Sequence, residues 1–117
     1  MSCKLALTVW LAAAPSIAIA GETATAMANP RATVEIHDFR FEPATLTVSA
    51  GTTVTWENED DAPHTVTDKS RSFRSAALDT KDRFSYTFTE PGEFTYFCTL
   101  HPMMVGRVII KPAGSSS

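Results

Sequence analysis

The sequence predicts an all-β protein, a Greek-key β-sandwich of six to eight strands. Short segments alternate between apolar and polar residues, as half-buried antiparallel strands do. Turn residues separate these segments, and no sustained apolar period of 3.6 residues follows the N-terminal region. Many short strands in so short a chain favour a sandwich over other all-β folds. We expect at most one short helical turn, over residues 75–81.

Six segments carry the alternation, and each is rich in Thr, Val or aromatic residues. In chain order they are 33–36, 45–48, 53–57, 84–88, 94–98 and 107–110. Ala50-Gly51 and Pro91-Gly92 supply turn residues between segments. Trp56 shares one face of its segment with Val54, so we expect it in the core. The aromatic residues of 84–88 also lie on one face, which indicates packing.

The first twenty residues have the pattern of a secretory signal peptide. Lys4 gives a positive start, an apolar run follows from Leu5 to Ala20, and Ala18-Ile19-Ala20 is a small-x-small cleavage site. Similar sites leave open a cleavage as late as residue 28. The run is shorter than the about 20 residues that a membrane span needs, and Pro15 interrupts it. We therefore expect a signal peptide over 1–20, export, and no membrane span in the mature protein.

Cleavage would leave enough chain for one small domain. We expect a flexible leader over 21–30, a folded domain over 31–112 and a disordered tail over 113–117. The chain carries 10 Lys and Arg residues against 13 Asp and Glu, with no stripe of basic residues. This mildly acidic balance argues against nucleic-acid binding. We expect a monomer.

One cysteine, Cys98, remains after cleavage, so no intrachain disulfide can form. A free thiol in an exported protein would oxidise unless it were buried or bound to a metal. His101 follows three residues later, Met104 three beyond that, and His64 lies well upstream. Two His, one Cys and one Met are the ligands of a mononuclear copper site for electron transfer. We expect the adjacent Met103 on the surface.

The wider sequence around these residues resembles the cupredoxins, the small blue copper proteins. The motif Cys98-Thr99-x-His101-Pro102-x-Met104 carries the resemblance, which is strongest to the amicyanins and weaker to pseudoazurin and plastocyanin. Supporting fragments are Gly51–Trp56, Ala62–His64, Phe88–Gly92 and Tyr96–Cys98. The resemblance covers essentially the whole mature domain and implies a cupredoxin-like domain over 31–112.

The resemblance also implies a function. One type 1 copper ion per chain would be held by His64, Cys98, His101 and Met104, and it would shuttle single electrons in the periplasm. His101 would be the port through which electrons pass. The redox protein partners would be a dehydrogenase donor and a cytochrome c acceptor.

Two positions depart from the family pattern. Thr65 stands where relatives usually have Asn, and its hydroxyl has a shorter reach for bonding across to the other ligand loop. Leu100 stands where relatives with this loop usually have Pro, so it restores a backbone N–H near the thiolate. We hypothesise a second N–H···S bond from Leu100, beside one from Thr65, that raises the reduction potential.

The remaining charged and titratable residues are expected to be solvated. His37 has no ligand partners at a useful spacing and is expected in a turn or facing solvent. Glu57 and residues 59–61 form an acidic run before His64, and three cations follow it: Lys69, Arg71 and Arg74. Such runs are usually solvated loops. The alternative is that they orient a redox partner and affect the on-rate more than the affinity.

An electron carrier is the favoured function, and an enzyme is not expected. Copper enzymes that use this fold need further His-rich centres, whereas this chain has three His in total. The alternative is a periplasmic copper-binding or copper-delivery protein. Cys98 argues against that alternative, because copper-delivery sites tend to be exposed and rich in Met and His.

Overall fold

The computed structural model describes residue 12 and residues 30–114. The predicted signal peptide, the leader up to residue 29 and the tail from residue 115 lie outside the described residues, apart from residue 12. Within the described part of the chain, no helix is long and apolar enough to cross a membrane.

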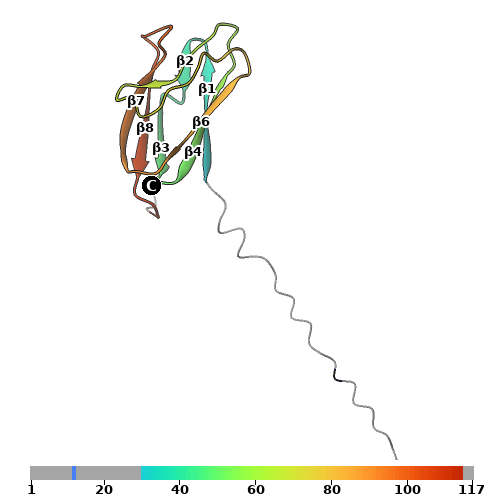
Figure 1. Cartoon of the computed structure of the whole chain (residues 1–117). Coiled ribbons are helices and arrows are strands. Elements are labelled where there is room, and N and C mark those ends of the chain that lie inside the picture. The colour runs from blue at the N-terminus through green and yellow to red at the C-terminus, as the bar shows by residue number, and fades with distance from the viewer. Residues whose placement is uncertain (1–11, 13–29, 115–117) are drawn as a thin grey trace, which may run out of the picture.

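Eight strands form two four-stranded sheets that pack face to face (Figure 1). The strands are β1 (Arg31–His37), β2 (Arg40–Glu42), β3 (Thr45–Ser49), β4 (Thr52–Asn58), β5 (Thr67–Asp68), β6 (Arg83–Phe88), β7 (Gly92–Phe97) and β8 (Val105–Lys111). One sheet has the order β2-β1-β4-β6 and the other the order β3-β8-β7-β5. The predicted all-β sandwich is confirmed.

Strand direction differs from the prediction in two places. β1 pairs with β4 in parallel, and β3 pairs with β8 in parallel. The other pairs are antiparallel, as expected. The β1–β4 pair is parallel because β2 and β3 come between these strands in the chain and β3 lies in the opposite sheet. The chain then returns to β4 in the direction of β1. Alternation within one strand reports the buried face but not the direction of its neighbour.

Trp56 lies at the centre of the core between the sheets. Its side chain is fully buried and stacks on Phe73 with ring centroids 5.7 Å apart. Tyr96 contacts it edge-on from the opposite sheet at 5.3 Å. Phe88 is buried, and Phe84 and Tyr86 are half-buried against the same cluster. These aromatic side chains supply a large share of the buried apolar area, and both core predictions are confirmed.

The segment 75–81 forms no helical turn, so that expectation is wrong. Residues 80 and 81 lie in a turn closed by the Asp82 N–H on the Asp79 carbonyl oxygen at 2.9 Å. Before this turn, Leu78 makes a two-way backbone bridge with His64, with N···O distances of 3.1 and 2.7 Å. The buried Asn58 side chain donates to the carbonyl oxygens of Leu78 and Ala62, both at 2.9 Å. Leu78 itself is buried. These contacts override the local sequence and attach the segment carrying His64 to the sandwich.

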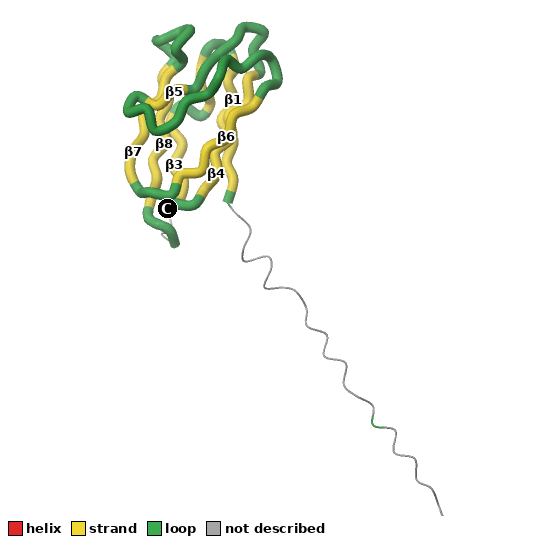
Figure 2. Tube along the Cα trace, viewed as in Figure 1, coloured by secondary structure: helices red, strands yellow, loops and turns green. Residues whose placement is uncertain are grey.

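The loops that carry the predicted ligands gather at one end of the sandwich. The β7–β8 connection, which carries Cys98, His101 and Met104, lies at the upper end in Figures 1 and 2, and the β1–β2 turn lies at the same end. The C-terminal end of the described chain and the β3–β4 turn lie at the opposite end (Figure 2). The frame thus separates the site from both described ends of the domain.

Candidate metal centre

Three of the four predicted ligands come together with their donor atoms facing one another. The candidate ligand atoms of His64, Cys98 and His101 all lie within 4.8 Å of one another. Cys98 Sγ is 3.8 Å from His64 Nδ1 and 3.7 Å from His101 Nδ1. His64 and Cys98 are fully buried, whereas His101 is partly exposed. A soft sulfur and two imidazole nitrogens therefore share one small space.

Cys98 and His101 are held by a tight loop between β7 and β8. Cys98 is the first residue after β7, and its N–H donates to the Met104 carbonyl oxygen at 3.1 Å. The Met104 N–H donates in turn to the His101 carbonyl oxygen at 2.8 Å. These two bonds close the loop on itself, so the spacing of the three residues is fixed by the backbone.

The two neighbouring methionines have opposite environments. Met104 is 5% exposed and belongs to the core, while Met103 is 96% exposed. The prediction that Met103 lies on the surface is confirmed. Met104, which bonds the loop through both its N–H and its carbonyl group, is the thioether held inside the protein at this end.

Asp60 orients His64 from behind. His64 Nε2 is 2.9 Å from Asp60 Oδ2, and a carboxylate only accepts at this distance, so Nε2 carries the hydrogen. Nδ1, which faces Cys98 Sγ, is then left with a lone pair for a metal. Such carboxylate–imidazole pairs are typical supports of metal-bound histidine.

The same carboxylate organises the turn between β1 and β2. Its oxygens accept the backbone N–H groups of Asp38 at 2.8 Å and Phe39 at 2.9 Å. Both residues have positive φ, 52° and 56°, which is unfavourable for side chains of this kind without support. Burial of Asp60 works to raise its pKa, but the hydrogen bonds from Phe39, His64 and Asp38 outweigh it and the pKa is lowered.

Phe39 contacts both histidines edge-on. Its ring centroid is 5.1 Å from that of His64 and 4.9 Å from that of His101. The interplanar angles are 89° and 88°, so both contacts are nearly perpendicular. The ring is 49% exposed and so borders the site on the solvent side. It restricts rotation of both imidazoles.

Neither Asp60 nor Phe39 was predicted as a site residue. The acidic run that contains Asp60 is expected to be solvated, yet the Asp60 side chain is only 11% exposed. A carboxylate four residues before a candidate ligand is the signal that could have identified it. Phe39 gave no such signal, because its position depends on the turn that Asp60 holds.

Thr65 links the two ligand-bearing segments, and the N–H···S bond expected from it is formed. Its N–H donates to Cys98 Sγ at 3.3 Å, and its hydroxyl accepts the Thr99 N–H at 2.7 Å. The Thr65 and Thr99 hydroxyls are also 2.7 Å apart. The short reach of threonine is sufficient because Thr99 supplies a second hydroxyl.

The second N–H···S bond proposed for Leu100 is not formed. In the described chain, Thr65 supplies the one backbone N–H donor to Cys98 Sγ. The loop turns outward at Leu100, whose side chain is 49% exposed. The structure therefore gives no support to the hypothesis that a Leu100 N–H···S bond raises the reduction potential.

His37 is exposed, as predicted, but it has acidic neighbours that its spacing did not indicate. Its Nε2 is 3.4 Å from Asp38 Oδ2, and its Nδ1 is 4.0 Å from Asp60 Oδ1. The charge runs are partly paired as well: Glu57 pairs with Arg83, and Glu59 pairs with Lys81.

Fold and site together define a β-sandwich protein that gathers one thiol and two imidazoles at one end for a metal. Residues 3–110 match the cupredoxin-like domain family, and the chain belongs to that family. The amicyanin of Paracoccus denitrificans is 36% identical over 93 residues, which cover 75% of this chain and 71% of that protein. The solved Cu(I) form of an amicyanin variant matches with a TM-score of 0.67 and 33% identity, covering 75% of this chain and 89% of the variant.

An enzyme also contains this fold, but only as one part. The copper-containing nitrite reductase of Thermus scotoductus matches with a TM-score of 0.64 and 32% identity. The match covers 69% of this chain but 22% of the reductase. Relatives nearer in length are amicyanins and a plastocyanin, which are carriers and not enzymes. The likeness to the reductase is thus to one part of that enzyme, whereas the amicyanin of Paracoccus denitrificans matches over most of its own length.

The Thr65 cross-link yields a stability prediction. Thr65→Val keeps the side-chain shape but removes the acceptor of the Thr99 N–H. The Thr99 N–H then loses its acceptor. Leaving a donor without its acceptor costs about 1–3 kcal/mol, so we expect a decrease of this size in the free energy of unfolding of the copper-free protein. Denaturant titration measures it. The matched control is Thr53→Val, which breaks the accessible hydroxyl pair with Thr87 at 2.7 Å. Equal losses in the two variants would contradict the assignment.

The lowered pKa of Asp60 yields a pH prediction. Because the folded-state pKa lies below the unfolded value of about 3.9, the carboxylate contributes stability that is fully present above that value. The contribution is lost as the pH falls through the lower folded-state pKa. We expect Asp60→Asn to lower the stability of the copper-free protein at neutral pH and to remove this part of its acid dependence. Unfolding followed by circular dichroism across acid pH measures both, with the exposed Asp61→Asn as control. Identical pH profiles for the two variants would refute the role of Asp60.

Proposed function

We propose that the protein is a periplasmic blue copper electron carrier. One type 1 copper ion would be bound by His64, Cys98 and His101, with Met104 as a weak axial ligand. The observation that carries the proposal is the convergence of Cys98 Sγ and the two Nδ1 atoms within 4.8 Å. A trigonal His₂Cys set with a distant Met is the ligand arrangement of electron-transfer copper sites.

The surrounding residues suit this donor set. Asp60 leaves His64 Nδ1 free to bind, and the Thr65 N–H stabilises a thiolate on Cys98. Met104 is buried at the same end, on the loop that carries the other two ligands. A buried lone thiol in an exported protein is protected from oxidation when a metal occupies it.

Copper, when bound, supplies a one-electron couple between Cu(I) and Cu(II). The chain would hold the same donor positions in both states, because each ligand is attached to the sandwich by backbone hydrogen bonds. Little rearrangement then accompanies the gain or loss of an electron, which favours fast transfer. The partly exposed His101 would be the port.

The proposed port is bordered by apolar side chains. Phe39 and Leu100 are each 49% exposed, and Met103 is nearly fully exposed. A small apolar surface suits brief contact with a redox protein. Similarity to amicyanin and the signal-peptide pattern support a periplasmic location, a dehydrogenase donor and a cytochrome c acceptor.

Adding Cu(II) to the purified domain tests the proposal. We expect one equivalent to give intense visible absorption from thiolate-to-copper charge transfer, an EPR signal with a narrow copper hyperfine splitting, and reversible reduction by one electron. Cys98→Ser should lose the colour, whereas Met103→Ala should keep it, since Met103 lies on the surface. A colourless wild-type complex, or a Cys98→Ser variant as blue as wild type, would refute the proposal.

A further inference from the structure

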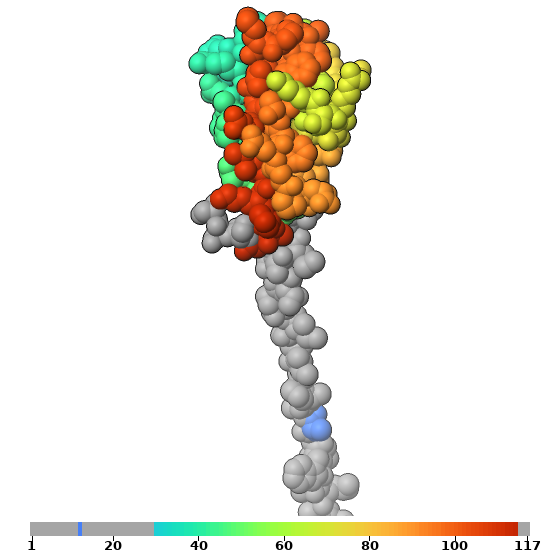
Figure 3. All heavy atoms as spheres, turned by 90° about the vertical axis from the view of Figure 1, so that its left-hand side faces the viewer, coloured from blue at the N-terminus to red at the C-terminus, as the bar shows by residue number. Residues whose placement is uncertain are grey.

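A groove of about 660 Å³, with both polar and apolar lining, lies beside the candidate metal centre. One wall is formed by residues of the segment 65–77, which includes β5, and the other by Phe97 and Thr99. Figure 3 shows this yellow-green segment standing out beside the orange strand β7, with which β5 pairs. The groove therefore includes the Thr65–Thr99 cross-link of the metal centre.

Three cations line the groove without a charged partner. Lys69, Arg71 and Arg74 are exposed, and none of them forms an ion pair within the described residues. Four other cations of the domain do form such pairs; they are Arg40, Lys81, Arg83 and Arg107. The groove thus concentrates unneutralised positive charge on a chain whose net charge is −3.

A tight turn presents these cations. Asp68 accepts the Ser72 N–H on its carboxylate at 2.9 Å and the Arg71 N–H on its carbonyl oxygen at 2.9 Å. Arg71 adopts a positive φ of 64° within this turn. Asp68 also lines the groove and is the one acidic residue there, so the cations outnumber it.

Thr67 lies under the groove and makes no charged contact in it. Its residue is only 8% exposed, and its hydroxyl oxygen is shielded from solvent, with no hydrogen-bond partner among the described residues. The case for a ligand therefore depends on the three exposed cations and on the place of the groove beside the metal centre.

We propose that this groove docks carboxylate side chains of an acidic redox partner protein. The inference rests on the proposed electron-carrier function and assigns the partner a surface chemistry and a docking place. Thr65 and Thr99 line the groove, and the Thr65 N–H contacts Cys98 Sγ at 3.3 Å, so a docked partner lies against the cross-link of the ligand loops. Complementary charge at such a site raises the on-rate and fixes the orientation of the partner.

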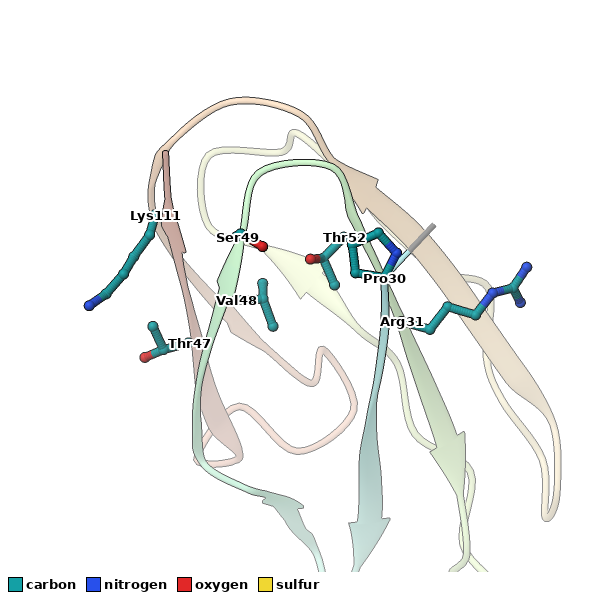
Figure 4. Close-up of a pocket in the computed structure, with 7 residues that line it drawn as sticks. All are labelled: Pro30, Arg31, Thr47, Val48, Ser49, Thr52 and Lys111. Atoms are coloured by element: carbon teal, nitrogen blue, oxygen red, sulfur yellow. The ribbon is translucent and has the colours of Figure 1, made fainter. Parts of the chain in front are cut away.

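The opposite end of the sandwich supplies a matched control. A second pocket there is lined by Arg31 and Lys111, which also lack an ion pair among the described residues. Figure 4 shows that their side chains point away from each other and out of that pocket. Replacing this pair changes the net charge as much as replacing two groove cations, but it leaves the groove intact.

The test is titration of the full domain with an oligoglutamate peptide, followed by the backbone amide NMR shifts of Thr67 and Lys69. At low ionic strength we expect Arg71→Gln/Arg74→Gln to weaken binding about threefold to tenfold relative to wild type. Arg31→Gln/Lys111→Gln should change the affinity for the peptide by less than about twofold, because Arg31 and Lys111 lie outside the groove.

Three results would overturn the inference. The two double variants could bind the peptide equally, the shifts could fall outside the groove, or free acetate at the same carboxylate concentration could shift the same amides as strongly as the peptide. The last result would identify a small-anion site instead of a docking surface. The titration can be made with or without copper, so its failure is distinct from a failure of the protein to form a blue copper complex.

Discussion

The structure depends on the contact between two segments that are far apart in the chain and meet at Cys98. The Thr65 N–H reaches Cys98 Sγ across 33 positions of sequence, and the hydroxyls of Thr65 and Thr99 join the same segments. This contact joins the segment of His64 to the loop that carries Cys98 and His101, and the Phe39 ring, which contacts both histidines, adds a second link. The contact is possible because His64 is held to the sandwich by its backbone bridge with Leu78. The sandwich therefore determines the positions of the donor atoms, because the loops that carry them are hydrogen-bonded to it.

The Asp60 carboxylate adds a second constraint on the donor geometry. Asp60 accepts hydrogen bonds from His64 and from the backbone of Asp38 and Phe39, so one carboxylate fixes an imidazole and places an aromatic ring against it. Polar groups of this kind are stabilising only when all their partners are present. Asp60 meets that condition through three donors. The Asp60 carboxylate therefore orients the His64 ring and the turn that carries Phe39. Glu57 and Glu59, by contrast, make surface ion pairs that contribute little to stability.

The sequence was sufficient for the features that depend on local pattern. The all-β class, the burial of Trp56 and the surface position of Met103 follow from alternation and spacing, and the convergence of Cys98 with His101 follows from a short loop. Strand direction, the backbone bridge between Leu78 and His64 and the role of Asp60 did not follow, because each is decided by partners from another sheet or loop. Leu100 shows the same limit: the sequence shows that it carries an N–H, but the direction of the loop is a tertiary property.

The central claim is that the protein holds its donor atoms in place before and after a change of oxidation state. Crystal structures of the copper-free, Cu(I) and Cu(II) forms test it directly, by the positions of the His64 Nδ1, Cys98 Sγ and His101 Nδ1 atoms after superposition of the two sheets. A rigid frame predicts that these atoms stay within about 0.5 Å across the three forms. Displacements of more than about 1 Å, or a His64 ring turned away from Cys98 without the metal, would show that copper and not the sandwich creates the site.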